Sequence, residues 1–283
     1  WCSATPDAAV GGNLDAFVAA VTAPPLLGRS LDDLRSFAVA SGQPAFRGKQ
    51  LHDALYGRAR VGSLAEATQL PAAFREALAA RSVGWGRSTI HSKVISADGT
   101  LKLLLRLHDG AVVECVGIPA RKAARSPRGG GVDTSAFARA RGSRGGDGCA
   151  TGAPPSLASS ERLTVCLSSQ VGCAMGCTFC ATGKQGGGRR NLLPHEIVDQ
   201  ALHIGEQMQH SGDTGFRRVD NAVFMGQGEA FMNLKNVLVA RARLNDSLDI
   251  GARSITLSTV GVPKTLERLA EAFATPAVDS PAA

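Results

Sequence analysis

The amino-acid sequence predicts an α/β protein in which a small α+β region precedes a series of βα units. Three observations lead to this prediction. Apolar residues recur at helical spacing between residues 31 and 81. Three runs rich in Val, Ile, Leu and Thr follow, separated by Asp-Gly pairs. From Arg162 onward, strand-like and helix-like segments alternate, which is typical of a parallel sheet or barrel.

The first of these regions, residues 31–81, is expected to be helical. From Leu31, apolar residues follow an i, i+3, i+6, i+7 spacing. Phe46–Tyr56 is a second helix candidate. Residues 63–66, Ser-Leu-Ala-Glu, have the spacing of a capping box and predict a further helix start. Pro71 is expected to open the last helix, because proline suits a first turn.

A three-stranded antiparallel meander is predicted next. Asp98-Gly99 and Asp109-Gly110 each separate two apolar runs, and Asp-Gly between such runs is a strong hairpin signal. With the helices before it, the meander makes an N-terminal domain over residues 31–120. The expected strands are 88–96, 100–107 and 111–118.

Two segments are expected to be poorly ordered. Residues 1–30 are rich in Ala, Pro and Gly. Residues 121–160 carry seven Lys or Arg among Gly, Ser, Ala and Pro, opposed only by Asp133 and Asp147. This segment cannot bury enough apolar surface to offset its ordering entropy. It is therefore predicted to be a basic linker or insertion, and it supplies most of the formal net charge of +7.

The remainder, residues 161–283, is predicted to hold three βα units. A cysteine-rich loop follows the first expected strand. The expected strands are 163–168, 221–225 and 254–258, and the expected helices are 194–210, 234–244 and 265–273.

Composition narrows the class of protein. A pI near 9.3 favours an anionic partner, with RNA or DNA as the first candidate. Seven cysteines, three of them in one loop, do not resemble a secreted disulfide framework, and a reducing compartment is expected. The sequence has no apolar run of the roughly 18 residues that a membrane span needs.

The chain begins at Trp1, so further sequence is expected upstream. A cytoplasmic protein is predicted, or a plastid or mitochondrial one if a transit peptide precedes this sequence.

The most informative motif is the spacing C-x3-C-x2-C formed by Cys173, Cys177 and Cys180. Gly172 and Gly176 allow the turns that bring three sulfurs together. A [4Fe–4S] cluster normally takes four cysteines, so three leave one iron open for chemistry. A zinc site is the alternative, but it would require a fourth Cys or His, and such sites more often show paired C-x2-C units. Three unrelated buried cysteines are disfavoured by the tight spacing.

This spacing, with Phe179 just before the third cysteine, resembles the radical S-adenosylmethionine (SAM) superfamily. The neighbouring sequence resembles the RlmN-type dual-specificity RNA methyltransferases within it. The resemblance covers about residues 30–120 and 161–272. It is carried by residues 42–51 (GQPAFRGKQL), 98–102 (DGTLK), 113–114 (VE), 165–186 (VCLSSQVGCAMGCTFCATGKQG), 223–229 (VFMGQGE) and 255–262 (ITLSTVGV).

The resemblance implies a partial (β/α)6 barrel, a [4Fe–4S] cluster and SAM as cofactors, and methylation of carbon-2 of adenine in 23S rRNA, and in many members tRNA. A methyl group placed on a cysteine near the C-terminus becomes a methylene radical that adds to the base. By this resemblance Cys166 resolves the adduct and Glu114, expected at the end of the third meander strand, accepts a proton. An electron donor such as flavodoxin or ferredoxin and a monomeric state are also implied.

The resemblance further assigns cofactor contacts. The cluster ligands are Cys173, Cys177 and Cys180, and Phe179 packs near the adenine of SAM. Gly228, Glu229 and Ser258 contact SAM from the ends of two expected strands. Without the resemblance, a G-x-G pair is usually a plain turn, a strand cysteine a small buried apolar residue, and a Glu at a strand end solvated.

Other charged residues receive weaker predictions. Arg47, Lys49, Arg58, Lys184, Arg189 and Arg190 could neutralise RNA phosphates, although solvated surface charge is nearly as good an explanation. His195, His203 and His210 lie near helical spacing and are expected only to form a polar helix face.

The sequence also departs from the family. No cysteine follows Cys180, so the methyl-carrying cysteine is absent from these 283 residues. Ala230 replaces the proline of the usual G-x-G-E-P, and Gln227 replaces an apolar residue. The tail after Phe273 is unlike the family. The chain is therefore expected to be C-terminally truncated and inactive by itself.

Three alternatives remain. The first is a degenerate iron–sulfur protein that binds RNA without catalysis. The second is another radical SAM reaction such as tRNA methylthiolation, which usually needs a second cysteine-bound cluster. The third is a zinc-bound RNA-binding module.

Overall fold

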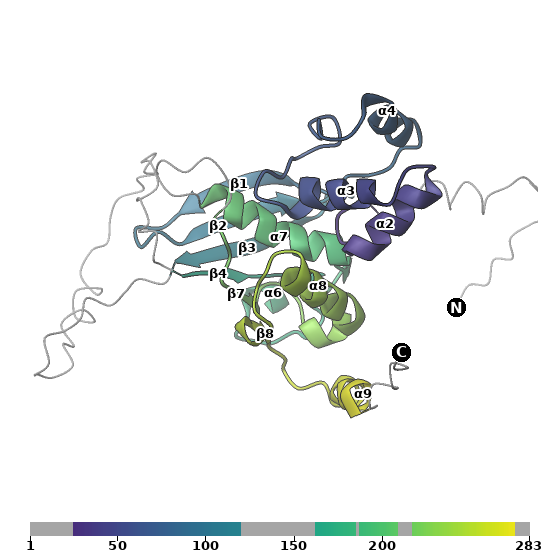
Figure 1. Cartoon of the computed structure of the whole chain (residues 1–283). Helices are drawn as coiled ribbons and strands as arrows, with labels where there is room; N and C mark the ends of the chain where they lie inside the picture. Colours follow the sequence, from purple (N-terminus) through teal and green to yellow (C-terminus); the bar gives the residue numbers. More distant parts are fainter. Residues whose placement is uncertain (1–24, 120–161, 185–186, 209–216, 275–283) are drawn as a thin grey trace, which may run out of the picture.

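The fold is built around one mixed β-sheet. The computed structural model describes residues 25–119, 162–184, 187–208 and 217–274. In this part of the chain, six strands form a sheet in the order β1-β2-β3-β4-β7-β8, and β5 and β6 form a separate pair (Figure 1). The strands are β1 Thr89–Ile95, β2 Leu101–Arg106, β3 Val112–Pro119, β4 Leu163–Cys166, β5 Gln170–Val171, β6 Arg190–Asn191, β7 Asn221–Phe224 and β8 Ile255–Leu257.

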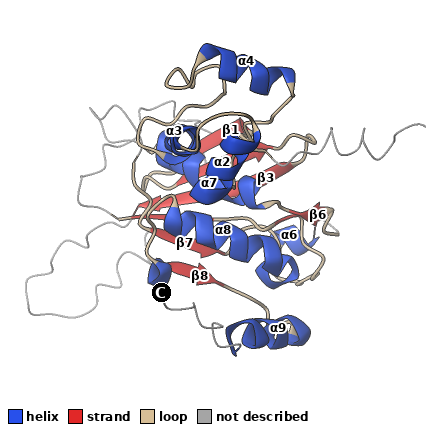
Figure 2. Cartoon of the chain, turned by 45° about the vertical axis from the view of Figure 1, so that its right-hand side comes forward, coloured by secondary structure: helices blue, strands red, loops and turns tan. Residues whose placement is uncertain are grey.

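Helices gather on one side of this sheet. Figure 2 shows α7 and α8 in front of the strands, α2 and α3 close to α7, and α9 standing apart beyond β8. The α-helices are α2 Leu31–Ala40, α3 Phe46–Tyr56, α4 Ala72–Ala80, α6 Ala181–Lys184, α7 Pro194–Gln207, α8 Leu234–Asp246 and α9 Pro263–Ala274, and the short 3-10 helices are η1 Ala230–Asn233 and η2 Ala252–Ser254.

The meander and the βα units, predicted as separate regions, share this sheet. β1, β2 and β3 pair antiparallel as expected, and β4, β7 and β8 run parallel, each followed along the chain by a long helix. β3 then pairs antiparallel with β4, with Val116 opposite Cys166. This pairing satisfies backbone groups of β3 that would otherwise lie at an open edge. The result is an α/β fold with a mixed, open sheet.

Helix α7 approaches the meander closely. Leu101, Leu103 and Leu105 of β2 are fully buried in the core. A Cβ atom on Gly117 of β3 would lie 2.7 Å from Cγ2 of Ile204, so only glycine allows α7 to pack this closely here. The same helix therefore covers strands from both sequence regions.

Ordered structure begins before Leu31. Leu26 and Leu27 are fully buried, and their amides donate to the carbonyls of Gly84 and Trp85. Residues 1–24 of the segment expected to be poorly ordered, the basic segment 121–160 and the tail 275–283 lie outside the described residues.

The capping box at residues 63–66 is a wrong prediction. Ser63 donates its hydroxyl to Glu66 at 2.7 Å and the Gly62 amide donates to the same carboxylate at 3.1 Å, but the chain forms turns and no helix there. Pro71 follows closely and disfavours the helical conformation of the residue before it. The capping box of this region forms instead at Ser30, where Ser30 and Asp33 exchange side chain–backbone hydrogen bonds at the start of α2.

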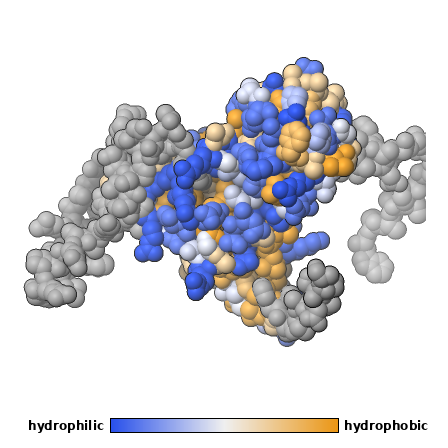
Figure 3. Space-filling model, viewed as in Figure 1, coloured by the Kyte–Doolittle hydropathy of each residue, from blue (hydrophilic) through white to orange (hydrophobic). Residues whose placement is uncertain are grey.

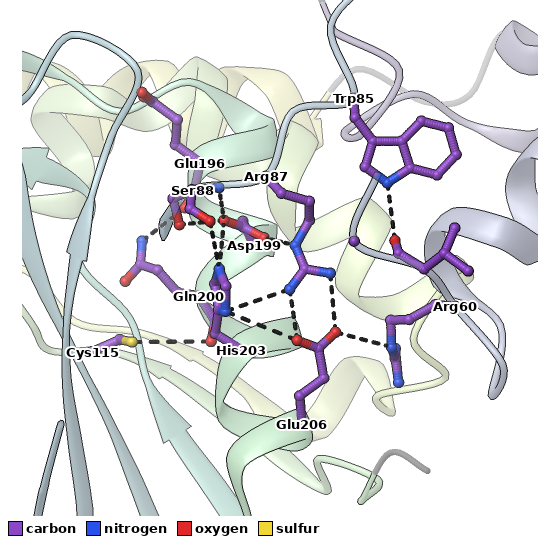
Figure 4. A network of polar contacts seen from close by, with 12 residues as sticks. Arg60, Trp85, Arg87, Ser88, Cys115, Glu196, Asp199, Gln200, His203 and Glu206 are labelled. Atoms are coloured by element: carbon purple, nitrogen blue, oxygen red, sulfur yellow. Dashed lines mark hydrogen bonds and ion pairs between the residues drawn. The ribbon is translucent and has the colours of Figure 1, made fainter. Parts of the chain in front are cut away.

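A buried polar network ties the N-terminal region to α7 (Figure 4). Arg87, just before β1, donates to Glu206 at 3.0 and 2.7 Å and pairs with Asp199 at 2.5 Å. Ser88 donates its amide and hydroxyl to Asp199, and His203 contacts the Ser88 carbonyl at 3.2 Å. Burial alone would raise the pKa of Asp199, but hydrogen bonds and charge from His203 and Arg87 hold it below its usual range.

The histidines of α7 do not form the exposed polar face that the sequence predicts. His195 and His203 are both buried, and His203 belongs to the network just described. Packing against the sheet and the N-terminal segment buries most of α7. His210 lies outside the described residues.

β1 and β8 are the two edges of the described sheet. Apolar side chains are exposed near β8, namely Met225, Met232, Val260 and Leu266. In Figure 3, orange surface gathers at the lower end of the molecule, where α8 and α9 lie. Within the described residues, no helix combines the length and apolar character that crossing a membrane requires.

Candidate functional site

Two of the predicted site residues share the face of the sheet turned away from α7. Burial alternates along β3, with Val113 and Cys115 buried and Glu114 and Val116 partly exposed. Cys166 of β4 lies opposite Val116 and is likewise partly exposed. Glu114 and Cys166 therefore lie on this open face, two residues apart in register. Glu114 lies within β3 and does not close it, which corrects the sequence prediction.

The environment of Cys166 disfavours its thiolate. Burial raises the pKa of the Cys166 thiol, a backbone hydrogen bond from Met225 partly offsets the rise, and the negative charge of Glu114 adds to it. Glu114 is itself paired with Lys102 of β2, whose ammonium lies 2.5 Å from Oε2 of the carboxylate.

Ser168 links the Glu114 strand to the loop after β7. The β3–β4 register, continued by two residues, places Ser168 opposite Glu114. Its hydroxyl donates to the Glu114 carbonyl at 2.5 Å and accepts the Gln227 amide at 2.8 Å. Its own amide and carbonyl are bound by the side chain of Gln200 at 2.8 and 3.0 Å. Ser168 is fully buried, so it connects three elements without solvent.

The loop Gly226–Glu229 is docked on the segment after β4. The Gln227 carbonyl accepts the amides of Ser169 and Gln170 at 2.8 and 3.2 Å. A Cβ on Gly226 would lie 2.7 Å from the Ser168 hydroxyl. Gly228 has φ +96°, and a Cβ there would lie 2.6 Å from the Gln170 Cβ. Both glycines are therefore required by the backbone packing itself.

Glu229 acts as a bridge between loops. Its side chain is buried, with one carboxylate oxygen accepting the Phe231 amide and the other the Val260 amide, each at 3.0 Å. Its own amide donates to Gln170 at 2.9 Å. The carboxylate thus joins the start of η1 to the loop after β8. The replacement of proline by Ala230 does not prevent this capping, because the Glu229 side chain still accepts the Phe231 amide at the start of η1.

Ser258 and the Gly226–Glu229 loop occupy equivalent places in the sheet. β7 ends at Phe224 and β8 at Leu257, so both follow the carboxyl ends of parallel neighbouring strands. Barrel and open α/β enzymes place their sites at this edge. Phe179 lies in the cysteine loop and its side chain is 88% exposed, so no described residue covers it as a core residue would be covered.

The cysteine loop leaves the sheet just after β5. Cys173, Cys177 and Cys180 are free thiols of intermediate exposure. Gly172 and Gly176 adopt φ of +75° and +64°, which supports the turn role expected for them. The amides of Gly183 and Thr182, at the start of α6, hydrogen-bond to Cys180 and hold its thiol pKa below the usual range. A lowered pKa favours the thiolate, which is the form that binds metal.

The structure does not gather these three sulfurs. In the described ranges, no three His, Cys, Asp or Glu side chains lie together as a group that could hold a metal ion. The donor chemistry nevertheless fits an iron–sulfur cluster: three unbonded thiols lie in one short loop whose glycines permit turning, and the pKa of one of them, Cys180, is lowered.

The two basic residues Arg189 and Arg190 near the cysteine loop differ in whether their side chains are already paired with protein carboxylates. Arg190 is committed to protein carboxylates, with bonds of 2.7 Å to Asp109 and 2.7 and 2.8 Å to Glu196. Arg190 is thus paired within the protein, whereas the sequence suggested either a phosphate contact or a solvated surface charge. Arg189 is exposed and lines a cavity of about 380 Å³ with Asp109 and the β2–β3 turn.

Sequence reasoning missed four residues that shape the site: Lys102, Ser168, Gln170 and Gln200. Their partners lie between 12 and 59 positions away along the chain, as for Lys102 with Glu114 and Gln170 with Glu229. Ser168 and Gln170 stand within a stretch that was singled out for its cysteines. The alternation of β2 and β3 around their Asp-Gly turn could have identified Lys102, because it places both side chains on one face.

Comparison with known proteins adds to this geometry. The model of the radical SAM superfamily matches residues 167–281. A probable dual-specificity RNA methyltransferase RlmN from Synechococcus elongatus is 46% identical over 249 residues, 88% of this chain and 55% of that protein. The protein of the same description from Trichormus variabilis is 44% identical over 247 residues, 87% of this chain and 56% of that protein.

A solved structure agrees in fold. The crystal structure of a radical SAM methyltransferase from Sphaerobacter thermophilus superimposes with a TM-score of 0.65 at 30% identity, covering 87% of this chain and 60% of that one. The chain thus spans a little over half the length of the curated relatives it matches. From these matches, together with the cysteine loop and the glycine loop after β7, we conclude that the chain belongs to the RlmN-type radical SAM methyltransferase family.

Proposed function

We propose that this chain is part of a methyltransferase acting on carbon-2 of adenine in 23S rRNA, and in tRNA as a further substrate. The observation that carries the proposal is the combination of the C-x3-C-x2-C loop with Glu114 and Cys166 on one sheet face, in a chain about 45% identical to probable RlmN enzymes. Three βα units would form half of a (β/α)6 barrel.

The radical SAM family implies a [4Fe–4S] cluster and SAM. Cys173, Cys177 and Cys180 would hold the cluster, which with bound SAM would supply one-electron chemistry that generates a radical. An electron donor such as flavodoxin or ferredoxin would reduce it. Gly228 and Ser258 lie at the strand ends where SAM would bind, and Gly228 would allow close approach of the cofactor to the backbone.

The chain's own residues would then handle protons and the adduct. The carboxylate of Glu114 would accept a proton from the methylated carbon of the base, and Sγ of Cys166 would resolve the covalent adduct. Ser168 would hold these two strands in register with the glycine loop. Glu229, whose two oxygens bind backbone amides, would position this loop against the loop after β8.

We also propose that the 283-residue polypeptide does not complete the reaction alone. It contains no cysteine after Cys180 that could carry the methyl group. The same observation favours a second candidate, a cluster-bearing protein that binds RNA without modifying it.

A chimera tests the two candidates. Residues 1–262 would be joined to the C-terminal part of the Synechococcus elongatus relative and expressed in bacteria that lack their own adenine carbon-2 methyltransferase. Nucleoside mass spectrometry of rRNA and tRNA should detect 2-methyladenosine in cells that express the chimera. It should detect none in cells that express the 283-residue chain or the Cys166→Ala chimera. A folded, iron-loaded chimera that binds RNA but leaves adenine unmodified would favour the second candidate.

A further inference from the structure

Lys102 occupies a defined place beside the two candidate catalytic groups. The register pairs Lys102 with Val116, and Val116 with Cys166, so these three residues form one row across β2, β3 and β4. Glu114 belongs to the next row of the same face, opposite Leu104. The lysine reaches diagonally to Glu114 and meets its Oε2 at 2.5 Å.

This ion pair leaves one carboxylate oxygen available. Among the described residues, no hydrogen bond or ion pair other than that with Lys102 reaches the side chain of Glu114. The carboxylate is therefore held through Oε2, while Oε1 can still accept a proton. The side chains of Lys102 and Glu114 are 48% and 33% exposed, so the pair is half-buried on the open face.

Few other charges lie on this face. Arg106, four residues beyond Lys102 on β2, is occupied with the ring of His91 at 2.9 Å. On the other side of Cys166, β7 presents Asn221 and Val223, which are uncharged. Among the residues that the structure describes, the charges that surround Cys166 on this face are thus Glu114 and its partner Lys102.

We propose that Lys102 is a positioning residue that fixes the Glu114 carboxylate toward Cys166 and neutralises part of its charge there. A half-exposed cross-strand ion pair contributes little stability in general. Its effect here is local, because it orients the only carboxylate of the row next to Cys166. The role of Glu114 in proton transfer rests on the proposed function, whereas the coupling of Lys102, Glu114 and Cys166 can be measured without catalysis.

Alkylation of Cys166 measures this coupling. The cluster-reconstituted chain would be treated with iodoacetamide between pH 7 and 11 without oxygen, and modification at Cys166 resolved from the cluster cysteines by fragment-ion mass spectrometry. The buried Cys115, on the opposite face of β3, should stay unmodified and thereby report intact folding. Lys102→Met should raise the midpoint by about half a pH unit, or slow alkylation at pH 8 by ~3-fold, because the Glu114 carboxylate near Cys166 then loses the cation that partly neutralises it. Lys102→Arg should keep the native midpoint.

Three further variants decide the outcome. Glu114→Gln should lower the alkylation midpoint of Cys166. In the Glu114→Gln background, Lys102→Met should shift this midpoint by less than half of the shift that Lys102→Met causes in the native chain. Lys93→Met, which removes a lysine bonded to Gln207 of α7, should change nothing. An unchanged midpoint in Lys102→Met, or an equal shift with and without Glu114, would overturn the proposal. Neither result would bear on the proposed function, because the 2-methyladenosine assay tests that function separately.

Discussion

Replacement of Ser168 by alanine tests how the site is held together. The substitution removes one hydroxyl from a fully buried side chain and, with it, the bonds to the Glu114 carbonyl and the Gln227 amide. A typical net hydrogen bond contributes about 1 kcal/mol, and a buried group left without a partner costs about 1–3 kcal/mol. Ser168→Ala should therefore lower the free energy of unfolding by about 2–4 kcal/mol.

The neighbouring Ser169 is a matched control. It is also buried, but its hydroxyl makes only a long contact of 3.5 Å with the Gln227 carbonyl. Ser169→Ala removes the same atom and should cost less than about 1 kcal/mol. Urea unfolding followed by circular dichroism, with linear extrapolation, compares the two variants. The bridging role of Ser168 would be refuted if Ser168→Ala cost no more than Ser169→Ala.

Three further predictions concern other parts of the chain. Gly228→Ala should cost about 2 kcal/mol or more in urea unfolding, because φ +96° is strained for alanine and its Cβ would collide; a native-like midpoint would contradict this. Arg87→Met should cost about 3 kcal/mol, since it strips a buried aspartate of its ion pair, whereas Arg35→Met at an exposed pair should cost under about 0.5 kcal/mol; equal costs would be inconsistent with the network. Hydrogen bonds from Arg190 depress the pKa of Asp109 to about 2, so its stabilising contribution is complete above about pH 3.8 and lost as the pH falls toward 2. In an NMR titration Arg190→Met should return the Asp109 midpoint toward 3.8, and an unmoved midpoint would exclude this cause.

Local signals in the sequence predicted most of the elements. The Asp-Gly pairs at 98–99 and 109–110 correctly located the meander, because each turn residue specifies its own short hairpin. Strand–helix alternation likewise predicted the three βα units. Each of these signals depends on residues within a few positions of one another. A single sequence is therefore enough to recognise them.

Long-range pairings could not be predicted in this way. β3 and β4 pair across the basic segment, and Arg87 meets Asp199 more than a hundred residues away. The capping-box pattern at residues 63–66 was misleading because the same two side chains can close a turn as readily as a helix start. Glu229 was predicted from family resemblance to contact SAM, and only the structure shows that its carboxylate binds two backbone amides.

The candidate site was predicted in part. The cysteine spacing identified the donor set, but not a converged arrangement, which the described residues do not form. The register of β3 and β4 brings Glu114 and Cys166 to one face, and no local sequence signal indicates that these two strands pair. Ser168 is identified only from this register, whereas Lys102 follows from the β2–β3 hairpin.

The central claim is that Cys173, Cys177 and Cys180 hold a [4Fe–4S] cluster whose open iron binds SAM. Anaerobic reconstitution of the 283-residue chain with iron and sulfide, followed by metal analysis and electron paramagnetic resonance of the reduced protein, tests it directly. The account predicts about four irons and four sulfides per chain and a paramagnetic resonance signal that changes when SAM is added. In Cys177→Ser, the bound iron and sulfide and the resonance signal should all be lost. Bound zinc in place of iron, or a cluster signal that SAM does not alter, would contradict it.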